Sequence, residues 1–215
     1  MKEIPILFST PMVQAILEDR KFMTRRVIKP QPLWIGESNI PFKTPDADPK
    51  GIIKFPYGQP GDRLWVRETW QLYNVDYKDE LGTSMILEDE WEGQMPKTKP
   101  WLTQILYKAT EIIEGWRAKW RPSIFMPRWA SRIDLEVVSV RVERLQDLTE
   151  EDAKAEGIEK GNTYYYGDPH PVKGSPKCYN TAKEAFAGLW DSLNAKRGFG
   201  WEQNNWLWVV EFKRI

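Results

Sequence analysis

Positive charge gathers in one short segment of this sequence, residues 17 to 32 (LEDRKFMTRRVIKPQP). The segment contains a single hydroxyl, on Thr24, and five cationic side chains: Arg20, Lys21, Arg25, Arg26 and Lys29. A threonine hydroxyl becomes a nucleophile when a base takes its proton, and lysine can be that base when burial or nearby cations lower its pKa from about 10.4. Lys21 and Thr24 are therefore a candidate catalytic pair. A surface lysine beside a loop threonine has the same spacing, and the arginines are equally suited to holding phosphate.

Three further stretches contain candidate site residues. Trp65 and Glu68 lie in GDRLWVRE, residues 61 to 68, where a turn enters a strand and both side chains can face a pocket or simply belong to the sheet. Arg128 and Trp129 lie in residues 116 to 132, where basic and aromatic side chains alternate, a pattern suited to phosphate binding and base stacking or to anchoring the segment on the core. Glu156 stands before Gly157 at the end of an acidic helix, where a carboxylate is either solvated or directed into a cleft.

Composition excludes several other kinds of site. Lys+Arg and Asp+Glu each number 31, so any electrostatic partner must be recognised by a local patch. One cysteine and one histidine cannot form an internal disulfide or a usual zinc site, and we expect neither a metal nor a cofactor. The apolar runs are shorter than the ~18 residues of a membrane span, and the N-terminus lacks the features of a signal peptide, so we expect a cytoplasmic protein without a membrane partner. Most of the 12 tryptophans are expected in the core or at its rim, with base stacking as the alternative.

The elements that must position these residues are strands separated by loops, with about three helices. Residues 5 to 8 read as a buried strand, and an amphipathic helix from Pro11 is expected to end near residues 19 to 21. Further helices are predicted after the caps Thr149 and Thr181. Strands are predicted at residues 63–68, 104–109, 133–142 and 206–213.

This order is not the regular strand–helix alternation of a parallel sheet. It favours an α+β fold in which the four predicted strands form one curved, mostly antiparallel sheet that closes toward a β-barrel decorated with helices. We expect a single domain over residues 1–215, with long loop insertions near 30–58, 71–103 and 159–180.

The chain resembles the ASCH domain family, a branch of the PUA-like barrels, and within it the uncharacterised ASCH-type proteins of phages and prophages. The family motif Gly-x-Lys-x-x-x-x-Arg corresponds to residues 19 to 26, where Lys21 and Arg26 match and Asp19 replaces the glycine. Three more landmarks follow in order along the chain: the turn Gly61-Asp62, the helix opening Leu148-Thr149-Glu150, and the terminal strand with Glu211-Phe212-Lys213.

The resemblance implies a function as well as a fold. A small family member is an amidohydrolase that removes the acetyl group from N4-acetylcytidine with a lysine, a threonine and a glutamate, which correspond to Lys21, Thr24 and Glu156 here; other members are thought to bind or cut RNA. We therefore expect a protein that binds a nucleoside or nucleic acid, RNA rather than DNA, and that hydrolyses an N-acylated base. The residues expected to bind the substrate are Arg25, Arg26, Trp65, Glu68, Arg128 and Trp129. The alternatives are a non-catalytic RNA- or DNA-binding module of phage origin and a phage interaction protein, and the insertions leave the exact substrate open.

Overall fold

The computed structural model describes residues 1–44, 49–78, 84–87, 97–98, 103–110, 120–160, 164–165 and 179–215. Much of the predicted insertion at residues 71–103 lies outside these residues, as do Trp116, His170 and Cys178. Within them the fold is mixed α+β, as predicted, and most strand pairs are antiparallel.

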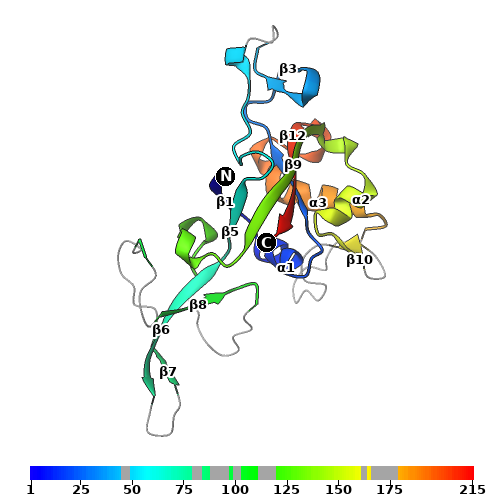
Figure 1. The fold of residues 1–215 in the computed structure, drawn as a ribbon. Coiled ribbons are helices and arrows are strands. Elements are labelled where there is room, and N and C mark those ends of the chain that lie inside the picture. The colour runs from blue at the N-terminus through cyan, green and yellow to red at the C-terminus, as the bar shows by residue number, and fades with distance from the viewer. Residues whose placement is uncertain are drawn as a thin grey trace.

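The largest sheet has five strands in the order β1-β5-β9-β12-β2 (Figure 1). Their bounds are Glu3–Leu7 for β1, Met23–Val27 for β2, Arg63–Arg67 for β5, Asp134–Arg144 for β9 and Trp206–Arg214 for β12. The edge strand β1 pairs with β5 in parallel, and the remaining pairs are antiparallel. The long strands predicted near the middle and the end of the chain, β9 and β12, form the longest ladder of this sheet.

The predicted closed barrel is wrong. In the described part of the chain β1 and β2 are the two edges of the sheet, and no backbone ladder joins them. The Arg26 side chain of β2 instead spans to β1, where Nη2 donates a hydrogen bond to the Leu7 carbonyl at 2.7 Å. A side chain therefore occupies the seam at which a barrel would close.

The prediction that residues 104–109 belong to the same sheet is also wrong. They form β8 (Thr103–Tyr107), which pairs with β6 (Trp70–Lys78) in a separate three-stranded sheet that includes β7 (Ser84–Leu87). This sheet extends away from the central one (Figure 1). The fully buried Trp70 packs there with Leu72, Met126 and Ala130. Strand β8 therefore belongs to a sheet with a small hydrophobic core of its own.

The described residues form three α-helices, which pack on the central sheet: α1 (Thr10–Leu17), α2 (Glu150–Ala155) and α3 (Ala182–Asn194). The caps predicted for two of them are present, since the Thr149 and Thr181 side chains accept from the backbone N–H groups of Asp152 and Glu184. Helix α1 ends earlier than predicted, so the basic segment continues as strand β2. The remaining short strands are β3 (Trp34–Ile35), β4 (Pro41–Phe42), β10 (Glu159–Lys160) and β11 (Tyr164–Tyr165). Single 3-10 turns are η1 (Glu37–Asn39), η2 (Pro49–Gly51), η3 (Ser123–Phe125), η4 (Arg128–Ala130), η5 (Leu145–Asp147), η6 (Ala195–Arg197) and η7 (Trp201–Gln203).

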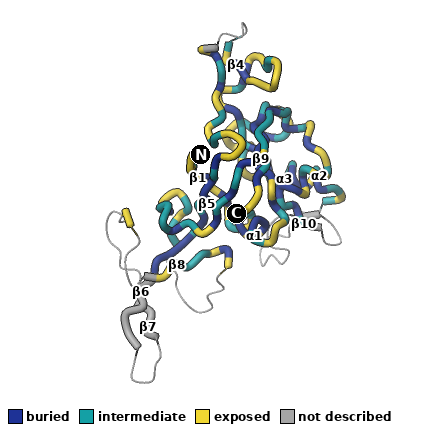
Figure 2. Tube along the Cα trace, viewed as in Figure 1, coloured by how far each residue is buried: buried dark blue, intermediate teal, exposed yellow. Residues whose placement is uncertain are grey.

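The core lies between these helices and the central sheet, in which β5 and β12 contain runs of three and four consecutive buried residues (Figure 2). Val13 and Ile16 of α1 pack on Leu64, Leu135 and Val210. A second cluster joins α2 and α3 to β12, through Phe186, Trp190 and Leu207 among others. The tryptophans that the structure describes include four that are buried (Trp65, Trp70, Trp190 and Trp208), three that pack partly buried against core clusters (Trp129, Trp201 and Trp206), and the exposed Trp34.

Gly157 fixes how closely the end of α2 approaches the end of α1. Its φ is +96°, in the left-handed region that favours glycine, and it follows the last turn of α2 as a helix stop. A Cβ atom at this position would lie 2.9 Å from the Ala15 Cβ and 3.3 Å from the Lys21 Cβ. The close approach therefore requires glycine for space as well as for backbone conformation.

We predict that Gly157→Ala lowers the free energy of unfolding by about 2–4 kcal/mol, from left-handed strain together with overpacking. The matched control is Gly198→Ala, because Gly198 has a φ of +81° but no described atom lies within 4 Å of the place that an alanine Cβ would take. That substitution should cost only the strain, about 1–2 kcal/mol. Urea unfolding of both variants measures the difference, and equal losses would contradict the close approach.

Candidate functional site

The turn between α1 and β2 places the motif residues. Asp19 has a φ of +56°, and the backbone N–H groups of Arg20 and Lys21 both donate to the Ala15 carbonyl, at 2.8 and 3.0 Å. Aspartate tolerates the left-handed region better than most residues other than glycine. Asp19 therefore meets the backbone requirement that a glycine would meet at this position, and its carboxylate also pairs with Arg214 at 3.1 Å.

Lys21 and Glu156, 135 residues apart in sequence, meet in the interior. Lys21 Nζ donates to Glu156 Oε2 at 2.6 Å and to the carbonyl oxygens of Glu156 and Met23, both at 2.8 Å. The Lys21 side chain is fully buried and the Glu156 side chain is 4% exposed. Burial lowers the pKa of the Lys21 ammonium from its ordinary value, and the Glu156 carboxylate opposes that shift.

Arg25 extends this pair into a network of buried and half-buried charges. Its side chain is fully buried, and its guanidinium contacts Glu156 at 3.4 Å, Glu143 at 3.2 Å and Asp152 at 2.8 Å. Arg141 bonds to Glu143 and Glu211 and lies 3.7 Å from Asp152. Buried charges are tolerated when each has partners of opposite sign, so these contacts hold α2, β2 and β9 in one arrangement.

A cleft of about 570 Å³ opens beside this network, at the seam between β1 and β2. Its wall includes Thr24, Arg26 and Glu156, and the aromatic rings of Phe8, Tyr57 and Trp190. Thr24 lines this cleft although the residue is only 3% exposed. The Met23 carbonyl that accepts from Lys21 belongs to the peptide unit preceding Thr24, so the ammonium lies next to the Thr24 backbone.

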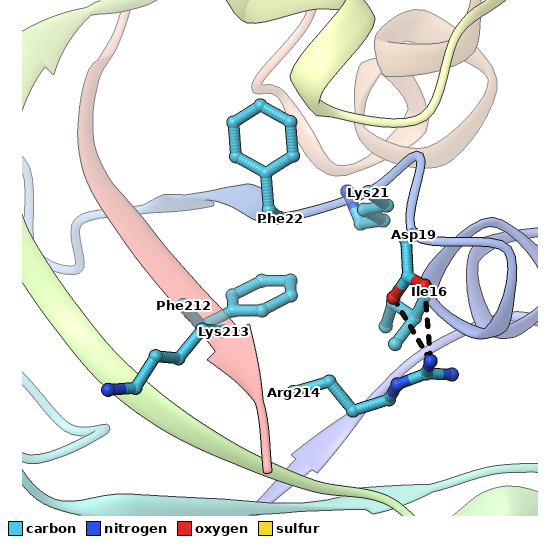
Figure 3. A pocket seen from close by; sticks show the side chains of 7 residues that line it. All are labelled: Ile16, Asp19, Lys21, Phe22, Phe212, Lys213 and Arg214. Carbon is cyan, nitrogen blue, oxygen red and sulfur yellow. Dashed lines mark hydrogen bonds and ion pairs between the residues drawn. The ribbon is translucent and has the colours of Figure 1, made fainter.

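A second, smaller cavity of about 340 Å³ is lined by Lys21. Figure 3 shows Phe22 and Phe212 facing each other across it, with the Asp19–Arg214 ion pair at one wall. Lys21 lines this smaller cavity, whereas Thr24 and Glu156 line the larger cleft.

The other predicted substrate-binding residues lie elsewhere. Glu68 forms an ion pair with Arg132 at 2.9 Å, and Arg128 forms ion pairs with Glu3 at 3.1 Å and Asp134 at 3.0 Å. The Arg128 guanidinium also lies 5.9 Å from the centroid of the Trp65 ring. Trp129 packs edge-on to Trp70, with 6.0 Å between the ring centroids. Burial raises the pKa of the Glu68 carboxyl, and Arg132 opposes the shift. None of these four predicted residues lines either cavity. Arg25 and Arg26, in contrast, both lie at the larger cleft, although Arg25 is occupied by carboxylates.

Several residues of the site have no specific signal in the sequence. Arg141 and Glu143 are two residues apart on β9 and therefore face the same side of the strand. Charged residues at this spacing are equally typical of a solvated strand face, so they do not indicate a site. Asp152 reads as part of the helix cap, and it does accept from the Thr149 N–H at 3.5 Å while also binding Arg25. Tyr57 lies in a loop and Arg197 at the end of η6, and local sequence pattern does not predict that either residue lines the cleft.

No family model, no curated protein and no solved structure matches this chain. Among the residues that the structure describes, no cluster of histidine, cysteine and carboxylate side chains is arranged to hold a metal ion. Within the same residues no helix is both long and apolar enough to cross a membrane.

We predict that Lys21→Met lowers the free energy of unfolding by about 3–5 kcal/mol, because it leaves the Glu156 carboxylate buried with only the longer Arg25 contact. Lys196→Met, at an exposed position, should change stability by about 0.5 kcal/mol or less. Denaturant titration of the two variants makes the comparison. A Lys21→Met protein as stable as Lys196→Met would show that the ion pair is solvated.

Proposed function

We propose that the protein binds a nucleoside, free or within a nucleic acid strand, in the larger cleft and hydrolyses an N-acyl group from its base. The supporting observation is that Lys21 contacts Glu156 at 2.6 Å while Glu156 and Thr24 both line the larger cleft, since these are the three residues that the resemblance to ASCH proteins connects. A cleft of about 570 Å³ is in the size range of small-molecule sites, and its aromatic wall suits a planar base. We also propose an ASCH-type, PUA-like ancestry with RNA as the preferred source of the nucleoside, on the strength of the ordered sequence landmarks.

In the proposed reaction Thr24 is the nucleophile and Lys21 its base. Neutral Lys21 accepts the Thr24 proton while the Thr24 oxygen attacks the acyl carbon. The resulting ammonium passes a proton across the 2.6 Å contact to Glu156, which delivers it to the leaving amine as the carbon–nitrogen bond breaks. Water then attacks the acyl–Thr24 ester, releasing the carboxylic acid and the free hydroxyl.

A non-catalytic binding module is the second candidate, and one observation favours it. An ammonium group has three N–H donors, and three acceptors lie within 2.6–2.8 Å of Lys21 Nζ. The charged form is thus fully satisfied, and the amine needed for catalysis would give up one of these bonds. In that case Lys21 holds the fold together and the cleft only binds.

Turnover of N4-acetylcytidine separates the two candidates. We expect the wild-type protein to release cytidine and acetate, Thr24→Val to lose at least about 10³-fold in rate, and Thr24→Ser to keep part of it, because serine retains the hydroxyl. Mass spectrometry of the nucleoside products makes the measurement, over a panel of acylated nucleosides. Binding without conversion by the wild type would support the binding module, and full activity of Thr24→Val would exclude Thr24 as the nucleophile.

The pH dependence tests the role of Lys21. Burial lowers the Lys21 pKa, and only the neutral amine is a base, so turnover should rise with pH through that lowered pKa and then level off. Glu156 opposes the shift, so Glu156→Gln should move the rise to lower pH even as it slows the reaction. Glu143→Gln is the control, since Glu143 contacts Arg25 and not Lys21. Identical profiles for the wild type and Glu156→Gln would remove Lys21 from the base role.

A further inference from the structure

The cations around the larger cleft differ from those of the buried network in their lack of counterions. Six arginines of the described chain form ion pairs with carboxylates: Arg20, Arg25, Arg128, Arg132, Arg141 and Arg214. Arg26, Lys29 and Arg197 form none with any described carboxylate, and all three line the larger cleft. Glu156 is the single carboxylate among the described residues of that wall, and it is already bound by Lys21 and Arg25.

Arg26 is the most constrained of the three. Its guanidinium lies over the rings of Phe8 and Tyr57, with Cζ 5.3 and 6.0 Å from their centroids. Only Nη2 has a hydrogen bond among the described residues, to the Leu7 carbonyl, and the buried Nε has no partner. A recessed guanidinium with unused donors and no counterion is suited to binding a planar or tetrahedral oxyanion.

Lys29 and Arg197 bring two more cations to the same cleft. Lys29 Nζ lies 4.6 Å from the centroid of Phe199, which is two residues beyond Arg197. Both cationic residues are exposed, so they attract an incoming anion without the desolvation cost of a buried charge. Together with Arg26 they give the cleft an excess of positive charge.

Strand geometry sets the position of this charge relative to the proposed nucleophile. Thr24 and Arg26 are two residues apart on β2, so they point to the same face with about 7 Å between their attachment points. Arg25 alternates with them along β2, and although it also lies at the cleft, its guanidinium is paired with the carboxylates of the network. A ligand with its reactive group at Thr24 therefore has an anion site within the same cleft.

We infer that Arg26, Lys29 and Arg197 form a phosphate subsite, so that the ligand of the cleft is a nucleotide and not a free nucleoside. This inference rests on the proposed function for the identity of the base-bearing part. The phosphate belongs either to a nucleoside monophosphate or to an internal phosphodiester of an RNA strand, and both present the same oxyanion to the guanidinium.

The test is a comparison of binding by N4-acetylcytidine, its 5′-monophosphate and a short single-stranded RNA containing the same base. Calorimetry on the Thr24→Val protein keeps the acyl group intact during the measurement. We expect the monophosphate, the RNA or both to bind at least about 10-fold more tightly than the nucleoside at low salt, with the preference shrinking as salt increases. The Lys29→Gln/Arg197→Gln protein should lose most of that preference, and Arg26→Gln should lose it further. Lys196→Gln, next to Arg197 but outside the cleft, should retain it.

Each result decides one question. Equal affinity for all three ligands would overturn the subsite. So would a preference for the phosphate-bearing ligands that is unchanged in both the double variant and Arg26→Gln, provided that both proteins melt at the wild-type temperature. A preference confined to the RNA assigns the site to an internal phosphodiester, and one shown by the monophosphate assigns it to the free nucleotide. If the wild type hydrolyses none of the ligands but the preference and its loss are observed, the amidohydrolase proposal fails while the phosphate subsite stands.

Discussion

The buried contact between Lys21 and Glu156 is the constraint on which the rest of this arrangement depends. A fully buried ammonium is tolerated only with its acceptors in place, and those acceptors come from two segments more than a hundred residues apart. The turn at Asp19 and the helix stop at Gly157 bring the two segments together, and both residues have a positive φ. At Gly157 the segments also approach so closely that there is no room for a side chain. Buried ion pairs contribute little net stability compared with apolar residues of the same volume, but they penalise any arrangement that separates the partners. We infer that this pair specifies how α2 docks on the turn before β2.

Because side chains alternate between the two faces of a strand, successive residues of β2 have different roles, some in the charge network and some in the cleft. Arg25 faces the carboxylates of α2 and β9, whereas Thr24 and Arg26 face the cleft. The same alternation explains the open sheet, because the Arg26 side chain bonds to the Leu7 carbonyl where β1 and β2 would otherwise pair. The Arg26 guanidinium and the rings of Phe8 and Tyr57 thus occupy the seam between the two unpaired edges, beside the cleft.

The parts of this fold that the sequence predicts are those with local signals. The long strand β9 has alternating valines, and α2 and α3 have capping threonines whose hydrogen bonds are present. Local pattern misses strand β2, because MTRRV carries two arginines and reads as a charged loop, although Arg25 is buried by partners that lie more than a hundred residues away. The placement of β8 and the parallel pairing of β1 with β5 likewise depend on distant contacts. Spacing alone gives no reason to connect Glu156 with Lys21; the resemblance to ASCH proteins does, and it offers no counterpart for Arg141, Glu143 or Asp152.

The neutral composition of the chain conceals how its charges act. The basic segment after α1 contributes Lys21 and Arg25 to the interior, where carboxylates cancel them, and Arg20 to a surface pair with Glu18. Arg26 and Lys29 are left without described carboxylate partners, at a cleft whose described wall holds one acid that is already occupied. The field that an approaching ligand meets is set by this remainder and not by the net charge, since paired charges largely cancel beyond a Debye length of about 8–10 Å. A chain with equal numbers of acidic and basic residues thus presents a locally cationic cleft, because the one acid of its described wall, Glu156, is already paired with Lys21 and Arg25.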